Sequence, residues 1–163
     1  MRFCKTFNLK KQIIPFIVCL ALPLIVGAVA GIATKNEVGI YNSLVLPPLS
    51  PPSYIFSLVW TVLYILMGIS SYIILKSKSW LKPKALYLYF AQLIFNFVWP
   101  FLFFNKEMYF ISFIWLMILW LLVLFMITMF WQVDKKASVL QIPYLLWLTF
   151  AAYLNLGIFI LNH

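Results

Sequence analysis

Five long apolar stretches, separated by short polar segments, dominate the hydrophobic pattern of this chain. They cover residues 12–34, 54–75, 85–104, 108–131 and 138–161, and none contains Lys, Arg, Asp, Glu or His. About 20 helical residues cross the hydrocarbon core of a bilayer. The segment from Trp115 to Phe130 is apolar on every side except at Thr128, whereas the strands of a membrane barrel alternate apolar and polar positions. The pattern therefore predicts an all-α integral membrane bundle of five transmembrane helices, forming one domain over residues 1–163.

Composition supports lipid as the main solvent of the chain. Hydrophobic residues make up 66% and charged residues 9%, against about 45–50% and about 25% in soluble domains. An intrinsically disordered chain is excluded, because such chains are poor in apolar and aromatic residues. A disulfide framework is excluded as well, because Cys4 and Cys19 are the only cysteines. The lipid bilayer is thus the first partner that the sequence indicates.

The basic residues are distributed unevenly between the two ends of the predicted spans. Lys35 and Lys106 fall on one side, and the other ten fall on the opposite side. These ten are Arg2, Lys5, Lys10, Lys11, Lys76, Lys78, Lys82, Lys84, Lys135 and Lys136. The positive-inside rule predicts a cytoplasmic amino terminus and an external carboxyl terminus, which fits a bacterial inner membrane. Because these residues sit in short segments beside lipid, anionic headgroups are expected around them rather than nucleic acid.

The first apolar stretch has a second interpretation. A basic start, an apolar run and the small residues Ala28-Val29-Ala30 also resemble a secretory signal peptide with its cleavage site. The run reaches about 20 residues, which is long for the apolar region of a signal peptide and suits a membrane span. We therefore favour a span, and cleavage would leave four.

The longest predicted loop, residues 35–53, contains four prolines between Pro47 and Pro52. Proline lacks the backbone N–H of a regular helix, and consecutive prolines favour a stiff, extended path. The stretch by itself favours a rigid linker that starts the second span. The other interpretation is a cap over the mouth of a cavity. In the first span, Gly27 and Gly31 have the spacing that allows close contact between membrane helices.

The sequence lacks the residues of conventional catalysis. Glu37, Glu107 and Asp134 are the only acids, all in predicted loops, and the only histidine is His163 at the end. No Ser–His–Asp set, metal site or phosphate-binding loop can be assembled from these residues. An ion-coupled transporter is disfavoured too, because no carboxylate lies within a span. We expect no metal, no cofactor and no acid–base catalytic residue.

Aromatic and amide side chains instead form stripes along three spans. They recur at steps of three, four or seven residues, which places them on common helix faces. The stripes comprise Trp60, Tyr64 and Ser71; Gln92, Asn96, Trp99 and Phe103; and Trp147, Ala151 and Asn155. One interpretation is that the amides link neighbouring helices while the tryptophans pack the core. The other is an apolar pocket with a few polar groups, the usual form of a small-molecule site.

These stripes fall within motifs that occur in order along the chain. They are Tyr41-Asn42-Ser43-Leu44 with Pro47 and Ser50-Pro51-Pro52; Val59-Trp60-Thr61-Val62-Leu63-Tyr64 with Met67-Gly68 and Ser71-Tyr72; Gln92-Leu93, Asn96, Trp99-Pro100 and Phe103-Phe104; and Pro143-Tyr144-Leu145-Leu146-Trp147, Phe150-Ala151 and Tyr153-Leu154-Asn155. The motifs resemble the TspO/translocator protein family, also called the peripheral benzodiazepine receptor or tryptophan-rich sensory protein family. The resemblance covers nearly the whole chain.

The resemblance implies a five-helix bundle, often a homodimer, with a pocket beneath the first loop. It implies hydrophobic planar ligands, above all porphyrins such as protoporphyrin IX, and also sterols, in sensing, transport or tetrapyrrole homeostasis. Motifs and stripes together give the expected ligand-binding set: Trp60, Tyr64, Asn96, Trp99, Phe103, Trp147, Ala151 and Asn155. Within it, Trp60 and Trp147 would stack on the ligand, Asn96 would offer a polar group and Ala151 would leave room. Residues 41–52 would form a lid.

The resemblance also implies an alternative function, light- and oxygen-dependent porphyrin degradation through Trp60 and Trp147. Three departures from the family pattern bear on the ligand. Leu49 stands where the family often has Trp, so one wall of the pocket is expected to be less aromatic. Ile114 stands where many members have Asp, so no contact to that carboxylate is expected. No basic residue follows Tyr153, so the vertebrate cholesterol motif is not expected here.

Overall fold

Five long helices form the molecule, as the hydrophobic pattern predicts. The computed structural model describes residues 3–34, 41, 43–105 and 108–162. The helices are α1 (Phe3–Thr34), α3 (Ser53–Lys76), α4 (Lys82–Pro100), α5 (Tyr109–Val133) and α7 (Ile142–Leu161). Each belongs to a segment long and apolar enough to span a membrane. The all-α membrane bundle is therefore confirmed.

Two short helices extend these spans. Pro100 cannot donate to the carbonyl of Asn96, and after it the chain continues as a wider π-helix, η2 (Phe101–Asn105). At the other end of α5, the short helix α6 (Lys135–Val139) precedes α7. The side chain of Asp134 caps α6 by accepting hydrogen bonds from the backbone N–H of Lys136 (2.8 Å) and Ala137 (3.2 Å).

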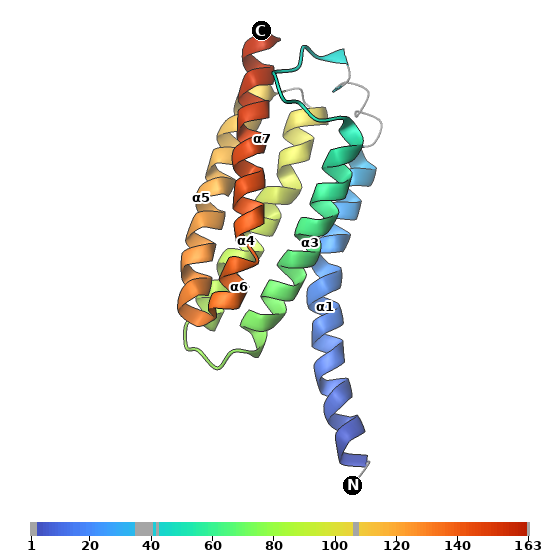
Figure 1. The fold of residues 1–163 in the computed structure, drawn as a ribbon, viewed down its shortest axis with the longest axis vertical. Coiled ribbons are helices and arrows are strands. Elements are labelled where there is room, and N and C mark those ends of the chain that lie inside the picture. Colours follow the sequence, from blue (N-terminus) through green and yellow to red (C-terminus); the bar gives the residue numbers. More distant parts are fainter. Residues whose placement is uncertain (1–2, 35–40, 42, 106–107, 163) are drawn as a thin grey trace.

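The two ends of the bundle differ in what they carry. Figure 1 shows the start of α1, the α3–α4 connection and α6 at one end, which we call the basic end. The carboxyl terminus of α7 and the segment 43–52 lie at the opposite end, the loop end. The structure thus places residues 76–84 and 135–136 with the start of α1, as the charge pattern predicts. Arg2, Lys35 and Lys106 lie outside the described residues.

Helix α1 packs mainly against α3 and is the least buried of the five. A Cβ atom on Gly68 of α3 would lie 2.7 Å from the Cα of Leu20, so this glycine lets the two backbones touch. Gly27 of α1 similarly accommodates the ring of Tyr64. Gly31 differs from the expected contact, because a Cβ there would meet no atom of the described residues within 4 Å.

The segment 43–52 is fixed to α7. The backbone of Val45 bonds to the Asn162 side chain through both its N–H (2.9 Å) and its carbonyl (3.0 Å). The Tyr153 hydroxyl donates to the Pro48 carbonyl (2.9 Å), and Pro47 occupies space that a Cβ on Gly157 would fill. This part of the expected loop 35–53 is therefore ordered by α7, while residues 35–40 and 42 lie outside the described residues.

Candidate functional site

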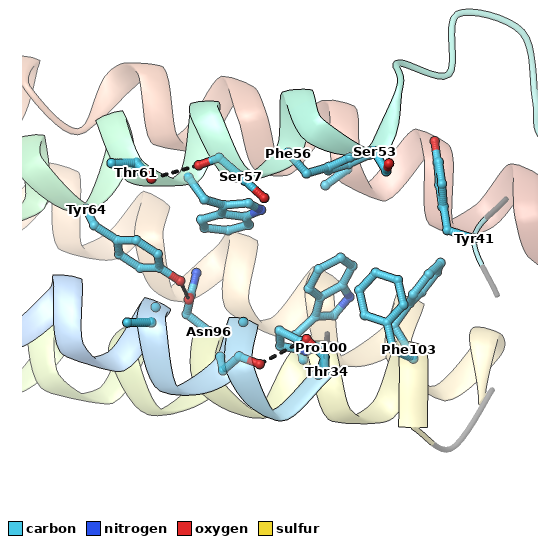
Figure 2. Close-up of a pocket in the computed structure, with 18 of the residues that line it drawn as sticks. Thr34, Tyr41, Ser53, Phe56, Ser57, Thr61, Tyr64, Asn96, Pro100 and Phe103 are labelled. Carbon is cyan, nitrogen blue, oxygen red and sulfur yellow. Dashed lines mark hydrogen bonds between the residues drawn. The ribbon is translucent and has the colours of Figure 1, made fainter. Parts of the chain in front are cut away.

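A cavity of about 670 Å³ lies at the loop end, between α1, α3, α4–η2 and α7. Figure 2 shows its lining side chains, which project from these helices toward a shared space. The volume falls within the usual range for small-molecule pockets, about 300–1,000 Å³. Tyr41, from the chain before the segment 43–52, closes part of the mouth together with Ser53.

Two pairs of stacked aromatic rings supply much of the wall. Trp60 stacks on Tyr64, with ring centroids 5.6 Å apart and planes 28° from parallel. Trp99 stacks on Phe103 at 5.5 Å and 29°. The rings come from two spans, α3 and α4 with its extension η2. Because each span presents its rings at steps of four residues, the period of the helix places them together.

Small residues form the remaining apolar wall. Ala151 lies on the α7 wall and is buried, and Gly27, Ala28 and Gly31 lie on the α1 wall. Larger side chains at these positions would occupy space that is now part of the cavity. The hollow therefore depends on small residues on α1 and α7 facing aromatic residues on α3 and α4.

A chain of hydrogen bonds begins at two cavity-lining residues, Tyr64 and Asn96, which we call the floor, and continues into the packed interior. The Tyr64 hydroxyl donates to Asn96 Oδ1 (2.7 Å), and Asn96 Nδ2 donates to the Tyr144 hydroxyl (3.0 Å). Tyr144 in turn donates to Gln92 Oε1 (3.0 Å). These bonds join α3, α4 and α7. A side-chain amide has two N–H donors and two lone pairs, so Asn96 keeps hydrogen-bonding capacity for a further group.

Asn155 makes a second polar junction on the same cavity. Its Oδ1 accepts from Trp99 Nε1 (3.2 Å) and lies 3.1 Å from Ser112 Oγ, while its Nδ2 donates to the carbonyl of Tyr109 (2.8 Å). The junction links α4, α5 and α7. The two interpretations of the amides are therefore compatible, because Asn96 and Asn155 both connect helices and border the cavity.

Seven of the eight expected ligand-binding residues line this cavity. They are Trp60, Tyr64, Asn96, Trp99, Phe103, Ala151 and Asn155. Whether they contact a ligand stays a prediction. Trp147 differs, since it is not on the wall: its ring packs against Phe56 (5.8 Å) and Phe150 (5.5 Å), and Phe56 takes the lining position. Among the described residues, the Trp147 indole N–H has no hydrogen-bond partner.

The α1 wall was missed at the level of sequence. Leu24, Ala30 and Thr34 line the cavity beside the α1 glycines, but α1 carries no aromatic or amide stripe to indicate this. The available signal was its run of small residues, which also fits helix packing. Two of the three departures from the family pattern are single substitutions that lie elsewhere: Leu49 is 82% exposed in the segment 43–52, and Ile114 is exposed on α5. Neither lines the cavity.

The site is uncharged over the part of the chain that the structure describes, since the lining contains no Asp, Glu, His, Lys or Arg. Its polar groups are hydroxyls, amides and indole N–H groups. At the mouth, the Tyr41 hydroxyl donates to the Pro51 carbonyl (3.2 Å). Burial raises the pKa of this phenol above its ordinary value, so it remains neutral at physiological pH. Such a site suits an apolar or weakly polar ligand rather than an ion.

Five apolar spans around an uncharged, aromatic-lined cavity define an integral membrane protein with a candidate site for an apolar small molecule. Comparison with known proteins gives the family. A model of the TspO/MBR family matches residues 19–161, and the chain belongs to that family.

Curated relatives agree with this assignment over most of their length. The chain is 34% identical to the tryptophan-rich protein TspO of Chlorobaculum tepidum over 158 residues, which cover 94% of this chain and 99% of the relative. It is 38% identical to the translocator protein of Ovis aries over 118 residues, which cover 71% of this chain and 70% of the relative. It is 36% identical to the tryptophan-rich sensory protein of Cereibacter sphaeroides over 122 residues, covering 75% and 76%.

Proposed function

We propose that this protein binds hydrophobic planar ligands of the porphyrin class, such as protoporphyrin IX, in the loop-end cavity. The observation that carries the proposal is the uncharged cavity of about 670 Å³ walled by Trp60, Tyr64, Trp99 and Phe103. Flat indole and phenol rings offer large apolar faces and favour offset stacking on another flat ring. Sterols share the apolar character but lack the extended π-system that would use these faces.

The polar groups of the site suggest how such a ligand would be oriented. Protoporphyrin IX carries two carboxylates, and burying a charge without a partner is costly. Because no described lining residue is basic, these carboxylates would point to the mouth, beside the hydroxyls of Tyr41 and Ser53. The ring system would then lie deeper, with Asn96 as the polar group of the floor.

The biological role that we propose is sensing, transport or tetrapyrrole homeostasis in a membrane. The names of the relatives, translocator protein and tryptophan-rich sensory protein, support a role of this kind. A bacterial inner membrane with the amino terminus in the cytoplasm is proposed from the charge pattern, and a homodimer from the family resemblance. Degradation through both Trp60 and Trp147 has less support, because Trp147 packs against Phe56 and does not line the cavity.

Titration of the vesicle-reconstituted protein with protoporphyrin IX tests the proposal. We expect saturable quenching of tryptophan fluorescence in the low-micromolar range, because Trp60 and Trp99 lie on the cavity wall. A parallel titration of a soluble tryptophan analogue with empty vesicles corrects for absorption by the porphyrin. Quenching that never exceeds this control would refute porphyrin binding.

A further inference from the structure

The cavity has one side on which its lining residues are also exposed. Five lining residues, which we call the rim, also lie on the surface of the described structure: Ala28 and Gly31 on α1, and Tyr54, Ser57 and Thr61 on α3. The α7 wall differs: its lining residues, Ala151, Leu154, Asn155 and Ile158, are all buried. The opening along the bundle therefore lies between α1 and α3.

The packing of α1 on α3 explains where this opening begins. Toward the basic end, Gly68 brings the backbone of α3 against Leu20, and Gly27 lies against the ring of Tyr64. One helical turn further toward the loop end, a Cβ on Gly31 would meet nothing within 4 Å in the part of the chain that the structure describes. The two helices therefore separate between Gly27 and Gly31. Figure 2 shows Ser57 and Thr61 on α3 and Thr34 of α1 on the opposite side of the cavity.

The rim lies within the segments that are long and apolar enough to span a membrane. All five rim residues belong to Gln12–Thr34 or Ser53–Lys76, so we expect them to border the acyl chains. At a rise of about 1.5 Å per residue, Gly31 is about 4.5 Å from the end of α1, and Thr61 is about 12 Å from the start of α3. The Thr61 hydroxyl donates to the Ser57 carbonyl (2.8 Å), so its hydrogen-bonding need is met within the helix. Such a rim can border lipid without leaving this donor unpaired.

We propose that the gap between α1 and α3 is a lateral portal, through which ligands already dissolved in the bilayer enter the cavity without passing through water. The proposal rests on the proposed ligand site and adds the source of the ligand: the hydrocarbon phase of the membrane. It also explains why the α1 side of the rim consists of the small residues Ala28 and Gly31, since a bulky residue at either position would narrow the passage.

The portal is tested first without any ligand. The variant Thr61→Cys is made in a background with Cys4→Ser and Cys19→Ser. Its single cysteine is labelled with the fluorophore bimane, and the protein is reconstituted in vesicles. We expect strong quenching by phospholipids brominated on their acyl chains and weak quenching by aqueous iodide, as for bimane at Ile32→Cys, an exposed α1 position. Bimane at Leu49→Cys in the segment 43–52 should show the reverse. Quenching at position 61 by iodide but not by brominated lipid would overturn the proposal.

Ligand kinetics then test passage through the gap. The series Gly31→Ala, Gly31→Leu and Gly31→Trp narrows it stepwise, and each replacement favours the helix over glycine. With protoporphyrin IX dissolved beforehand in the vesicles, we expect the association rate constant to fall along the series, by about tenfold for Gly31→Trp, as for a barrier raised by about 1.4 kcal/mol. Ile32→Trp, the matched control, should stay within about twofold of the wild type.

The two proposals fail separately. If the wild type binds porphyrin but the Gly31 series leaves both association and dissociation rates unchanged, the portal is refuted while the ligand site stands. If the wild type shows no saturable quenching, the porphyrin site is refuted, and the bimane measurement still decides whether the gap opens to lipid or to water.

Discussion

The basic-end and loop-end halves of the bundle use the same helices in opposite ways. In the basic-end half, large side chains such as Met67, Ile74, Phe130 and Leu148 have no exposed surface, and the Ser70 hydroxyl donates to the Ala137 carbonyl (2.7 Å). In the loop-end half, the helices surround a cavity of about 670 Å³. Interiors of proteins are normally packed without such voids. The contrast therefore indicates a division of roles: the packed half holds the helices together, and the loop-end half contains the cavity.

Residue size and one helix interruption account for the difference. Helix α7 has Leu148 in the packed half and Ala151 one turn later at the cavity. On α4, Pro100 ends the regular helix, and the π-helix that follows carries Phe103 to the cavity wall. Wider π-turns are frequent at functional sites. Small residues and a proline-terminated helix thus produce the hollow where continuous large residues would fill it.

The largest expected effect is on the packed half. Leu148→Ala should lower the free energy of unfolding by about 2 kcal/mol or more, because it opens a void in a filled region. Leu154→Ala, on the same helix but on the cavity wall, should cost less than about 1 kcal/mol, because this side chain already borders a void and its truncation only enlarges it. Equilibrium unfolding in bicelles measures both. Equal losses would contradict the division into two halves.

The next effect concerns the volume of the cavity. Ala151→Phe should weaken porphyrin binding by about 10- to 100-fold, because overfilling costs about 1–3 kcal/mol. The control is Ala33→Phe, the same replacement at an exposed α1 position outside the lining. Fluorescence titration in vesicles measures both affinities. An unchanged affinity in Ala151→Phe would show that the ligand does not occupy this space.

A smaller effect separates the two tryptophans. Trp60→Phe should weaken binding by about 3- to 10-fold, as expected for loss of part of an aromatic stacking interaction of about 0.5–1.5 kcal/mol. Trp147→Phe should change the affinity by less than about twofold, because that ring packs against Phe56 and does not line the cavity. Bleaching of bound porphyrin in light, measured on the same variants, tests the degradation alternative. Loss of bleaching in both variants alike would favour that alternative.

The smallest expected effects concern the segment 43–52. Leu49 has a positive φ of 68°, a conformation that costs a side-chain-bearing residue about 1–2 kcal/mol. Leu49→Gly should therefore slow hydrogen exchange of the Val45 amide by a few-fold. Gly157→Ala should accelerate it, because the added Cβ would lie 2.7 Å from the Cβ of Pro47. Exchange measured by mass spectrometry compares the two variants. The same direction of change in both would contradict docking of this segment on α7.

Hydropathy was sufficient to predict the five spans, because helix length and burial in lipid are set by local composition. The expected spans 54–75 and 108–131 agree closely with helices α3 and α5. The short α6 was not predicted, since it depends on a single cap by Asp134. The π-helix follows from the backbone hydrogen bond that Pro100 cannot make. Hydropathy does not show how the neighbouring helices accommodate that loss.

The candidate site was predictable where aromatic and amide residues recur at helical spacing. The loop-end members of the α3 and α4 stripes line the cavity because their spacing fixes a common face, whereas Ser71 and Gln92, nearer the basic end, do not. Two features depended instead on contacts between helices: the packing of Trp147 against Phe56 instead of on the wall, and the α1 wall around Gly31. Equal spacing gave Gly27 and Gly31 the same expectation, although only Gly27 meets a neighbouring ring. A single sequence does not encode such differences locally.

A structure of the protein with protoporphyrin IX would show directly where the ligand binds. We expect the tetrapyrrole inside the loop-end cavity, with its ring against Trp60, its edge near Ala151 and its carboxylates at the mouth beside Tyr41. A tetrapyrrole bound on the lipid-facing surface, with the cavity filled by rearranged side chains, would contradict it.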